Sequence, residues 1–482
     1  MFDVRPVAYV IGLLTACLGA SMLIPMALDL WVGNGHWPAF AESAIITAGV
    51  GVLMSMATAN GVGDRLTIQQ TFLLTTGVWL ALPVFGALPM YLGATEARYV
   101  DAFFESMSGL TTTGATVFTQ LEDLPDGLKL WRSMLQWFGG IGIIVVAMVF
   151  LPELRVGGMQ IFRSESFDTM GKVLPRAVQI AAQISYFYIG LTIASGVAYV
   201  IVGLPPFEAI NHALTTMSTG GFSTSDASFG AFQGAPEYVA SFFMILASLP
   251  FVRYVQLLSG SAKPLLRDSQ LRAYLATIFG FTILFTLFRL YAFGDHPEEG
   301  FREGLFNVVS IISGTGYASV DYQLWGSLAV AVFFFLGLIG GCAGSTACSV
   351  KIFRYQLLFA SIKAQIRRIH TPHGIFQPRY DGKPVSEDVL SSVMSFFVMF
   401  VVSLGVLSVL LGMTGLDFIT SVSGAASALA NIGPGLGSEI GPAGNFSGLN
   451  DTAKWMLAAG MLIGRLELLA VYAIFTIRFW RA

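Results

Sequence analysis

Long apolar segments recur through the whole chain and constrain its fold more than any other feature. A transmembrane helix needs roughly 20 consecutive apolar residues. Only 11% of the 482 residues are charged, against about a quarter in soluble domains. The sequence therefore predicts an all-α integral membrane protein of about ten spanning helices, an even number that places both termini on one side. The predicted spans are 7–32, 38–59, 70–92, 128–152, 177–204, 236–259, 272–294, 324–350, 388–413 and 452–478.

The positions of the basic residues predict the orientation of these spans. With the N-terminus inside, the inner segments hold 19 of the 26 Lys and Arg residues and the outer segments hold six. Because basic residues are retained on the cytoplasmic side, we expect both termini in the cytoplasm. The outer segments are instead rich in carboxylates, which would raise the local cation concentration. An ordinary solvated loop surface would have the same composition, so the carboxylates alone do not assign a function.

Four outer stretches share one pattern, at intervals of roughly one hundred residues. Each has an acidic and aromatic–apolar run of about a dozen residues, too short to cross a bilayer, followed by a Gly-rich turn. We expect a re-entrant half-helix followed by irregular backbone at membrane depth, which is tolerated only when it is buried in protein or lines a water-filled cavity. The pattern therefore predicts four repeats around a central cavity. The stretches are VDAFFESMSGLTTTGATVF (100–118), PFEAINHALTTMSTGGFSTSD (206–226), EGLFNVVSIISGTGYASVDY (303–322) and LDFITSVSGAASALANIGPGLGSEIGP (416–442).

Alignment of the four turns puts a glycine at one shared position. Rings of backbone carbonyls can replace the hydration shell of a cation, and glycine adopts backbone angles that other residues resist. The negative ends of four half-helix dipoles would favour a cation at the same point. Any single turn could be an ordinary helix C-cap, but four in register predict a cation pore. The aligned residues are Thr112-Thr113-Gly114, Ser218-Thr219-Gly220 followed by Gly221, Gly314-Thr315-Gly316, and Asn431-Ile432-Gly433.

Two features inside the predicted spans draw attention to a possible gate. The stretch FFLGLIGGCAGSTACSVKIF (334–353) has four glycines within eight positions, and each weakens a helix by about 1 kcal/mol relative to Ala. A broken helix and a close-packing face both fit this composition. Arg465 lies within the last predicted span, where a charge usually faces an interior cavity and marks function. A structural ion pair with another repeat is the alternative, although Glu467 lies on a different helix face from Arg465.

The turns TTTGAT (111–116), STGGFST (218–224), SGTGYAS (313–319) and NIGPGLG (431–437) closely resemble the four pore loops of the Trk/Ktr/HKT superfamily of potassium transporters. The chain length and two additional N-terminal spans are similar to the bacterial TrkH/TrkG branch. The resemblance implies potassium uptake across the inner membrane by gated conduction. It implies a filter of backbone oxygens around the turn glycines, with Gly114 favouring potassium over sodium. The implied organisation is a two-helix extension at 1–60 followed by repeats at 61–175, 176–265, 266–380 and 381–482.

The resemblance also implies a gate, partners and no cofactor other than the transported K⁺. Arg465 matches an arginine that lies beside an intramembrane gating loop in the family. The implied partners are a second copy of the chain and a cytoplasmic nucleotide-binding regulator of the RCK type, called TrkA. The basic stretch 351–388 could dock such a partner or only enforce topology. The chain has no G-x-x-x-x-G-K-[ST] motif, so any nucleotide control would come from another chain. The implied gating-loop residues are Gly340, Gly341, Gly344, Ser345 and Thr346.

Two other functional classes compete with gated conduction. A symporter that couples potassium to protons or sodium can also use discontinuous helices, but coupling needs an ion-binding group on the path, and Glu467 is the one obvious intramembrane candidate. A membrane enzyme would need a nucleophile–base pair, an H-E-x-x-H motif or paired carboxylates in a span, and the sequence contains none. His212, in the second short run, is expected to be a packed, hydrogen-bonded residue. We therefore expect a transporter and no enzyme.

Overall fold

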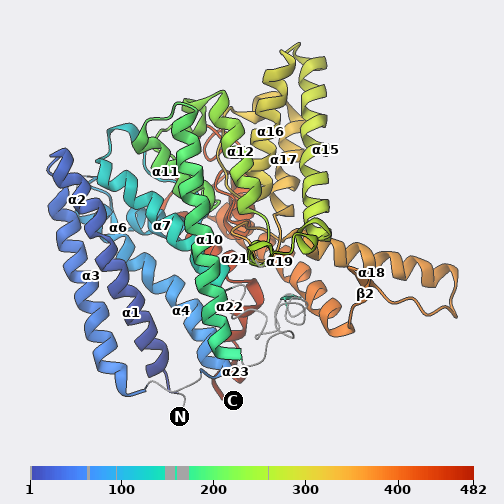
Figure 1. Cartoon of the computed structure of the whole chain (residues 1–482), viewed down its shortest axis with the longest axis horizontal. Helices are drawn as coiled ribbons and strands as arrows, with labels where there is room; N and C mark the ends of the chain where they lie inside the picture. Colours follow the sequence, from blue (N-terminus) through green and yellow to red (C-terminus); the bar gives the residue numbers. More distant parts are fainter. Residues whose placement is uncertain are drawn as a thin grey trace.

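A computed structural model describes residues 3–61, 66–93, 95–146, 158–159, 173–258 and 260–481. This part of the chain is mostly helical, as expected, and its strands are the two-residue pair β1 (Arg379–Tyr380) and β2 (Lys383–Pro384). Both ends of the chain lie at the same end of the molecule (Figure 1). Gln70 and Gln69, at the start of helix α4 (Ile68–Gly86), donate hydrogen bonds to the carbonyls of Asp3 and Phe479 respectively. The two termini therefore lie at the same end of the molecule.

The N-terminal extension is a hairpin of α1 (Arg5–Ser21), continued by α2 (Leu23–Val32), and α3 (Trp37–Thr58). These helices stand at one edge of the molecule (Figure 1). Small residues allow α1 and α3 to pack closely: a Cβ on Gly12 would lie 2.8 Å from the Gly51 carbonyl oxygen, and one on Gly19 would lie 2.5 Å from the Ala48 nitrogen. Such contacts bring helix backbones together in a bilayer, where apolar burial alone does not drive association.

The rest of the chain repeats one unit four times: a long helix, a short helix, an irregular loop and a further helix. The first helices are α4 (Ile68–Gly86) with α5 (Leu88–Leu92), α10 (Val173–Ile201), α15 (Ser269–Ala292) and α19 (Glu387–Met413). The short helices are α6 (Tyr99–Leu110), α11 (Pro206–Met217), α16 (Pro297–Ser313) and α20 (Phe418–Ala430). The further helices are α7 (Asp126–Val145), α12 (Ala235–Ala247) with α13 (Phe251–Leu258), α17 (Ser327–Ile339), and α21 (Asp451–Arg465) with α22 (Leu468–Ile474). The expected fold class is confirmed.

The number of spans stays a prediction. Six described helices are long and apolar enough to cross a membrane, and eight if each of two bent pairs counts as one span. The predicted straight spans 236–259 and 452–478 are wrong in shape, because they bend by 87° and 109°. Pro250, at the first bend, lacks a backbone N–H and disfavours a helical residue before it. At the second bend, Glu467 has a φ of 62°, which interrupts a right-handed helix.

A third predicted span also differs from a straight helix. In the predicted span 324–350, α17 ends at Ile339, and residues 340–351 form a loop. The helix therefore breaks, as one interpretation of its glycines predicted. The end of the predicted span 128–152 lies outside the described residues. After the loop, α18 (Ile352–His370) projects away from the helical body (Figure 1). The chain then returns, and Tyr380 of the β1–β2 hairpin packs against the buried cluster that contains Phe353 and Val389, before α19 begins.

Candidate ion pathway

The four turns, which we call loop 1 (111–116), loop 2 (218–224), loop 3 (313–319) and loop 4 (431–437), share one backbone geometry. Each begins with a pair of residues that have positive φ and are separated by one residue; loop 4 has a further such residue at its end, Gly437. Left-handed angles are uncommon outside glycine, so four such pairs in different sequences indicate a common structure. The pairs are Thr112 (51°) and Gly114 (84°), Thr219 (50°) and Gly221 (78°), Gly314 (75°) and Gly316 (80°), and Asn431 (51°) and Gly433 (107°).

The backbone hydrogen bonds give the same register. In each loop, the residue between the two left-handed positions donates its N–H to a carbonyl five residues earlier in the short helix. The bonds are Thr113 to Ser108 (2.8 Å), Gly220 to Thr215 (2.9 Å), Thr315 to Ser310 (2.9 Å) and Ile432 to Ser427 (3.1 Å). The register expected for loop 2 is therefore wrong by one residue, since Gly221 rather than Gly220 matches Gly114. Two adjacent glycines hide this from an alignment of letters, and only the backbone angles distinguish them.

The loops close into a ring. A Cβ on Gly114 would collide with the carbonyl oxygen of Gly220, and one on Gly221 would collide with that of Thr315. A Cβ on Gly316 would likewise collide with the carbonyl oxygen of Ile432. The fourth contact returns to the first loop, because a Cβ on Gly433 would lie 2.8 Å from the Thr113 carbonyl oxygen. The expected backbone residues are thus brought together, with each glycine against a carbonyl of the next loop.

A cavity of about 140 Å³ opens directly onto this ring, with all four ring glycines in its lining. Its rim is held together across loops 1 and 2. The Asp226 carboxylate accepts the backbone N–H of Gln120 at 2.7 Å, and Glu122 accepts the Ser225 hydroxyl at 2.6 Å. The hydrogen bond from Ser225 lowers the pKa of Glu122 below its ordinary value. The cavity gives the ring an open mouth on the side where the short helices begin.

In three of the short helices, a polar side chain forms a hydrogen bond with the extended segment that leads out of the loop. Glu105, His212 and Asn307 all lie seven residues before the first left-handed residue. Glu105 accepts the Val117 N–H at 2.9 Å, and Asn307 donates to the Ser319 hydroxyl at 3.0 Å. These clamps were missed by sequence reasoning, although their shared spacing is a signal that could have found them.

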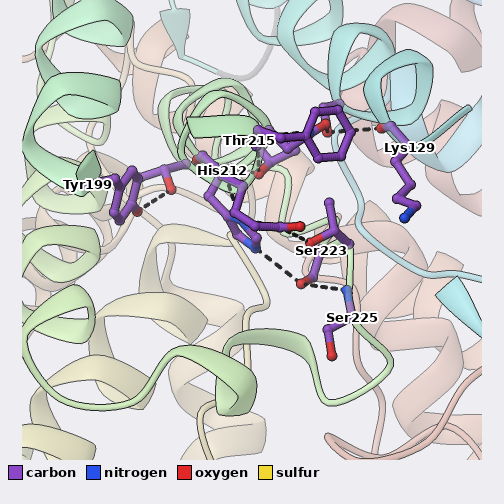
Figure 2. A network of polar contacts seen from close by, with 12 residues as sticks. Lys129, Tyr199, His212, Thr215, Ser223 and Ser225 are labelled. Atoms are coloured by element: carbon purple, nitrogen blue, oxygen red, sulfur yellow. Dashed lines mark hydrogen bonds and ion pairs between the residues drawn. The ribbon is translucent and has the colours of Figure 1, made fainter. Parts of the chain in front are cut away.

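His212 is packed and hydrogen-bonded, as expected. Figure 2 shows it pointing toward Ser223, whose hydroxyl oxygen lies 3.1 Å from Nε2 and also accepts the Ser225 N–H at 3.2 Å. The other ring nitrogen lies 2.9 Å from the Glu208 carbonyl oxygen. With both nitrogens engaged by structural partners, His212 supports loop 2 rather than any chemistry.

The predicted gating loop lies against the inner side of the ring. The Ser349 N–H donates to the Ala430 carbonyl at 3.0 Å, and a Cβ on Gly314 would lie 2.9 Å from the Cβ of Cys348. Gly340 and Gly344 have φ values of 79° and 75°. The neighbouring bent pair anchors the loop, since the Phe251 N–H donates to the Gly344 carbonyl and the Cys342 N–H to the Ser248 carbonyl. Local bonds fix the remaining predicted residues: Gly341 accepts from the Ile352 N–H, Ser345 donates to Cys342, and Thr346 donates to Ala247.

Arg465 reaches this loop from the last repeat. Its NH1 donates to Cys348 Sγ at 2.7 Å and lies 3.4 Å from the Thr346 carbonyl oxygen. The side chain is buried, and within the described residues its Nε and NH2 have no hydrogen-bond partner. An incompletely paired guanidinium therefore lies beside the loop 340–351, next to the ring.

Glu467 does not pair with Arg465, as the helix geometry predicted. It forms a buried ion pair with Arg354, the third residue of α18. The sequence alone does not single out Arg354, because it is one of many basic residues in the predicted inner segments. The carboxylate considered for ion coupling is therefore already neutralised by a partner.

Fold and site together define a class: a multi-pass helical membrane protein whose four loops close a ring of glycines and carbonyls. The TrkH family model, described as a cation transport protein, matches residues 36–480, and the chain belongs to this family. The potassium uptake protein TrkI of Halomonas elongata is 42% identical, over 99% of this chain and 97% of the relative. TrkH of Escherichia coli is 33% identical over 99% of both chains.

A solved structure agrees with these relatives. The crystal structure of the potassium transporter TrkH from Vibrio parahaemolyticus superposes with a TM-score of 0.91, covers 100% of both chains and is 31% identical. The expected resemblance is confirmed, and so is the expectation of a transporter rather than an enzyme. Members of this family are transporters and no cofactor is implicated, so the ring is the structural feature that bears on function.

Proposed function

We propose that this protein takes up potassium across the bacterial inner membrane by selective, gated conduction through the ring. The observation that carries the proposal is the closed order of contacts, in which Gly114, Gly221, Gly316 and Gly433 each lie against a carbonyl of the next loop. Carbonyl rings of this kind replace the hydration shell of a cation without a fixed charge that would trap it. Relatives named as potassium uptake and transport proteins over the whole length support potassium as the ion.

The pathway has the order expected of a gated pore. The outer cavity leads to the ring, and the loop 340–351 with Arg465 lies beneath it. In our proposal the guanidinium repels cations and the loop obstructs them until it moves. The basic residues of the inner segments support cytoplasmic termini. The four repeat boundaries at 61–175, 176–265, 266–380 and 381–482 belong to the same proposal.

The projecting helix α18 supports the proposed partners, a second copy of the chain and a TrkA-type regulator. It carries an exposed apolar stripe at helical spacing, flanked by basic residues such as Lys363 and Arg367. Isolated apolar side chains on a surface are ordinary, but a continuous stripe on a helix outside the bilayer marks an interaction surface. Its apolar residues are Phe359, Ile362, Ile366 and Ile369.

Tracer uptake in bacteria that lack their own potassium uptake systems tests the proposal. Cells that express the chain should take up rubidium, with competition by external potassium and not by sodium. Gly114→Ser should abolish this preference, because the new Cβ collides with the Gly220 carbonyl. Gly203→Ser is the matched control: its φ of 100° is also positive, so a side chain strains the backbone there too, but no atom lies within 4 Å of the new Cβ. Equal competition by sodium and potassium in the wild type would contradict the proposal.

A further inference from the structure

Loop 2 differs from the other three loops at the residue that precedes the ring glycine. Thr113, Thr315 and Ile432 have side chains at this position, whereas loop 2 has Gly220 followed by Gly221. A residue without a Cβ explores far more backbone conformations than any other. Two in succession would make the peptide between them the least restrained part of the ring.

Gln136, on α7 of the first repeat, occupies the space that a side chain at position 220 would otherwise fill. Its Nε2 donates to the Gly220 carbonyl at 2.6 Å, and its Oε1 accepts the Phe222 N–H at 3.0 Å. One partner can only accept and the other can only donate, so the amide orientation is fixed. The side chain is fully buried, and a Cβ on Gly220 would collide with its amide. Gln136 therefore fills the space that a side chain at position 220 would take.

This restraint is particular to loop 2. Of the four equivalent carbonyls in the described chain, those of Thr113, Gly220, Thr315 and Ile432, Gly220 alone accepts a hydrogen bond from a side chain. One turn earlier on α7, Arg132 donates to the Ser223 carbonyl at 2.9 Å. The same helix face therefore holds loop 2 at 220, at 222 and at 223.

We propose that Gln136 is a positioning residue that determines specificity. It fixes the Gly220 carbonyl, whereas in the other loops the residue's own side chain restrains the equivalent position. The inference rests on the proposed function, since it assumes that the ring selects potassium. Selectivity of a carbonyl ring depends on how many carbonyl dipoles face the ion and where they are held. Without Gln136, the peptide between Gly220 and Gly221 rotates, and the ring adapts to the smaller sodium ion.

Purified protein in liposomes tests this inference through the ratio of potassium to sodium permeability, measured separately from total potassium flux. Gln136→Leu keeps the side-chain volume but removes both hydrogen bonds. We expect the permeability ratio to fall at least about fivefold, the factor that corresponds to the loss of one buried hydrogen bond, while potassium flux persists. A Gln136→Leu ratio equal to that of the wild type would overturn the inference.

Gln323→Leu is the matched control. Gln323 holds the backbone of Gly437 in the same two-bond manner, with its Nε2 3.2 Å from the carbonyl oxygen and its Oε1 2.7 Å from the nitrogen. Gly437 lies four residues beyond the ring glycine of loop 4, so Gln323→Leu should leave the ratio of potassium to sodium permeability unchanged. An equal loss of selectivity in both variants would show a general effect of loosened loops and would overturn the role of Gln136.

A rescue variant separates positioning from folding. Gly220 does not have a positive φ, so a side chain is conformationally allowed there once the glutamine is removed. Gln136→Ala with Gly220→Thr gives loop 2 the residue found in loops 1 and 3, and should restore most of the selectivity that Gln136→Ala loses. A double variant no more selective than Gln136→Ala would contradict the inference. A wild type without potassium preference would instead overturn the proposed function, a distinct result.

Discussion

The ion pair between Arg132 and Glu105 joins loop 1 to loop 2, and its removal gives a quantitative prediction. Both side chains are buried, and Arg132 Nε lies 2.8 Å from Glu105 Oε1. The guanidinium also donates to the Ser223 carbonyl at 2.9 Å and lies 4.3 Å from the centre of the Phe222 ring. Glu105 in turn accepts the N–H of Val117. Each charge therefore depends on the other inside the membrane region.

Arg132→Leu leaves the Glu105 carboxylate buried without its cation. Removal of one partner from a buried pair costs about 3–5 kcal/mol, whereas replacement of both partners by uncharged groups is often nearly neutral. We therefore expect Arg132→Leu to lower the free energy of unfolding by about 3–5 kcal/mol. The double variant Arg132→Leu with Glu105→Gln should lose clearly less, because the amide oxygen still accepts the Val117 N–H.

Unfolding of the purified protein in mixed micelles, titrated with sodium dodecyl sulfate and followed by tryptophan fluorescence, measures these differences. Arg98→Leu is the control, since Arg98 is 59% exposed and pairs with Asp101 and Asp451 at the surface. Surface ion pairs contribute about 0–1 kcal/mol. The reasoning is refuted if Arg132→Leu destabilises no more than Arg98→Leu. It is also refuted if the double variant loses the sum of the two single losses.

Three further predictions follow from the gate, the outer rim and α18. Arg465→Ala should raise basal potassium flux at unchanged expression; unchanged or lower flux would contradict its role as an electrostatic barrier. The pKa of Glu122 is lowered in the folded protein, so its stabilising contribution is present above its ordinary pKa of 4.5 and is lost as the pH falls below it. The wild type should melt above Glu122→Gln at pH 7, and the difference should shrink as the pH falls from 4.5 through the lower pKa of the folded protein; a constant difference would exclude this origin. Ile366→Asp on the exposed stripe should weaken self-association in light-scattering measurements; an unchanged dimer would locate the interface elsewhere.

Much of the architecture could be predicted because it depends on length and hydrophobicity, which the sequence states directly. The short helices α6, α11, α16 and α20 follow the predicted half-helix pattern, and the loops that follow them contain the expected glycines. The two bends were missed: Pro250 is a sequence signal for the first, whereas no residue type marks the second, at Glu467. The apolar pattern continues through both, and the direction of the chain there is set by contacts with other repeats.

The supports of the ring were missed for a different physical reason. Arg132 was counted among the outer basic residues, and Gln136 had no distinguishing pattern, because a polar residue near the end of an apolar segment resembles a residue in contact with water. Both are buried, since their partners are backbone groups of a loop more than 80 residues away. The register error in loop 2 has the same origin, because Gly220 and Gly221 are the same residue type and differ only in the backbone angles and contacts of the folded chain.

Cation flux through the purified protein in liposomes, with no proton or sodium gradient imposed, is the most direct test of selective conduction. Potassium, rubidium, sodium and lithium are compared under the same conditions. The account predicts fast flux of potassium and rubidium down their own gradients, and little flux of sodium and lithium. Flux that begins only when a proton or sodium gradient is added would contradict it. The protein would then be a coupled transporter, and the buried pair of Glu467 and Arg354 would be the first site to test.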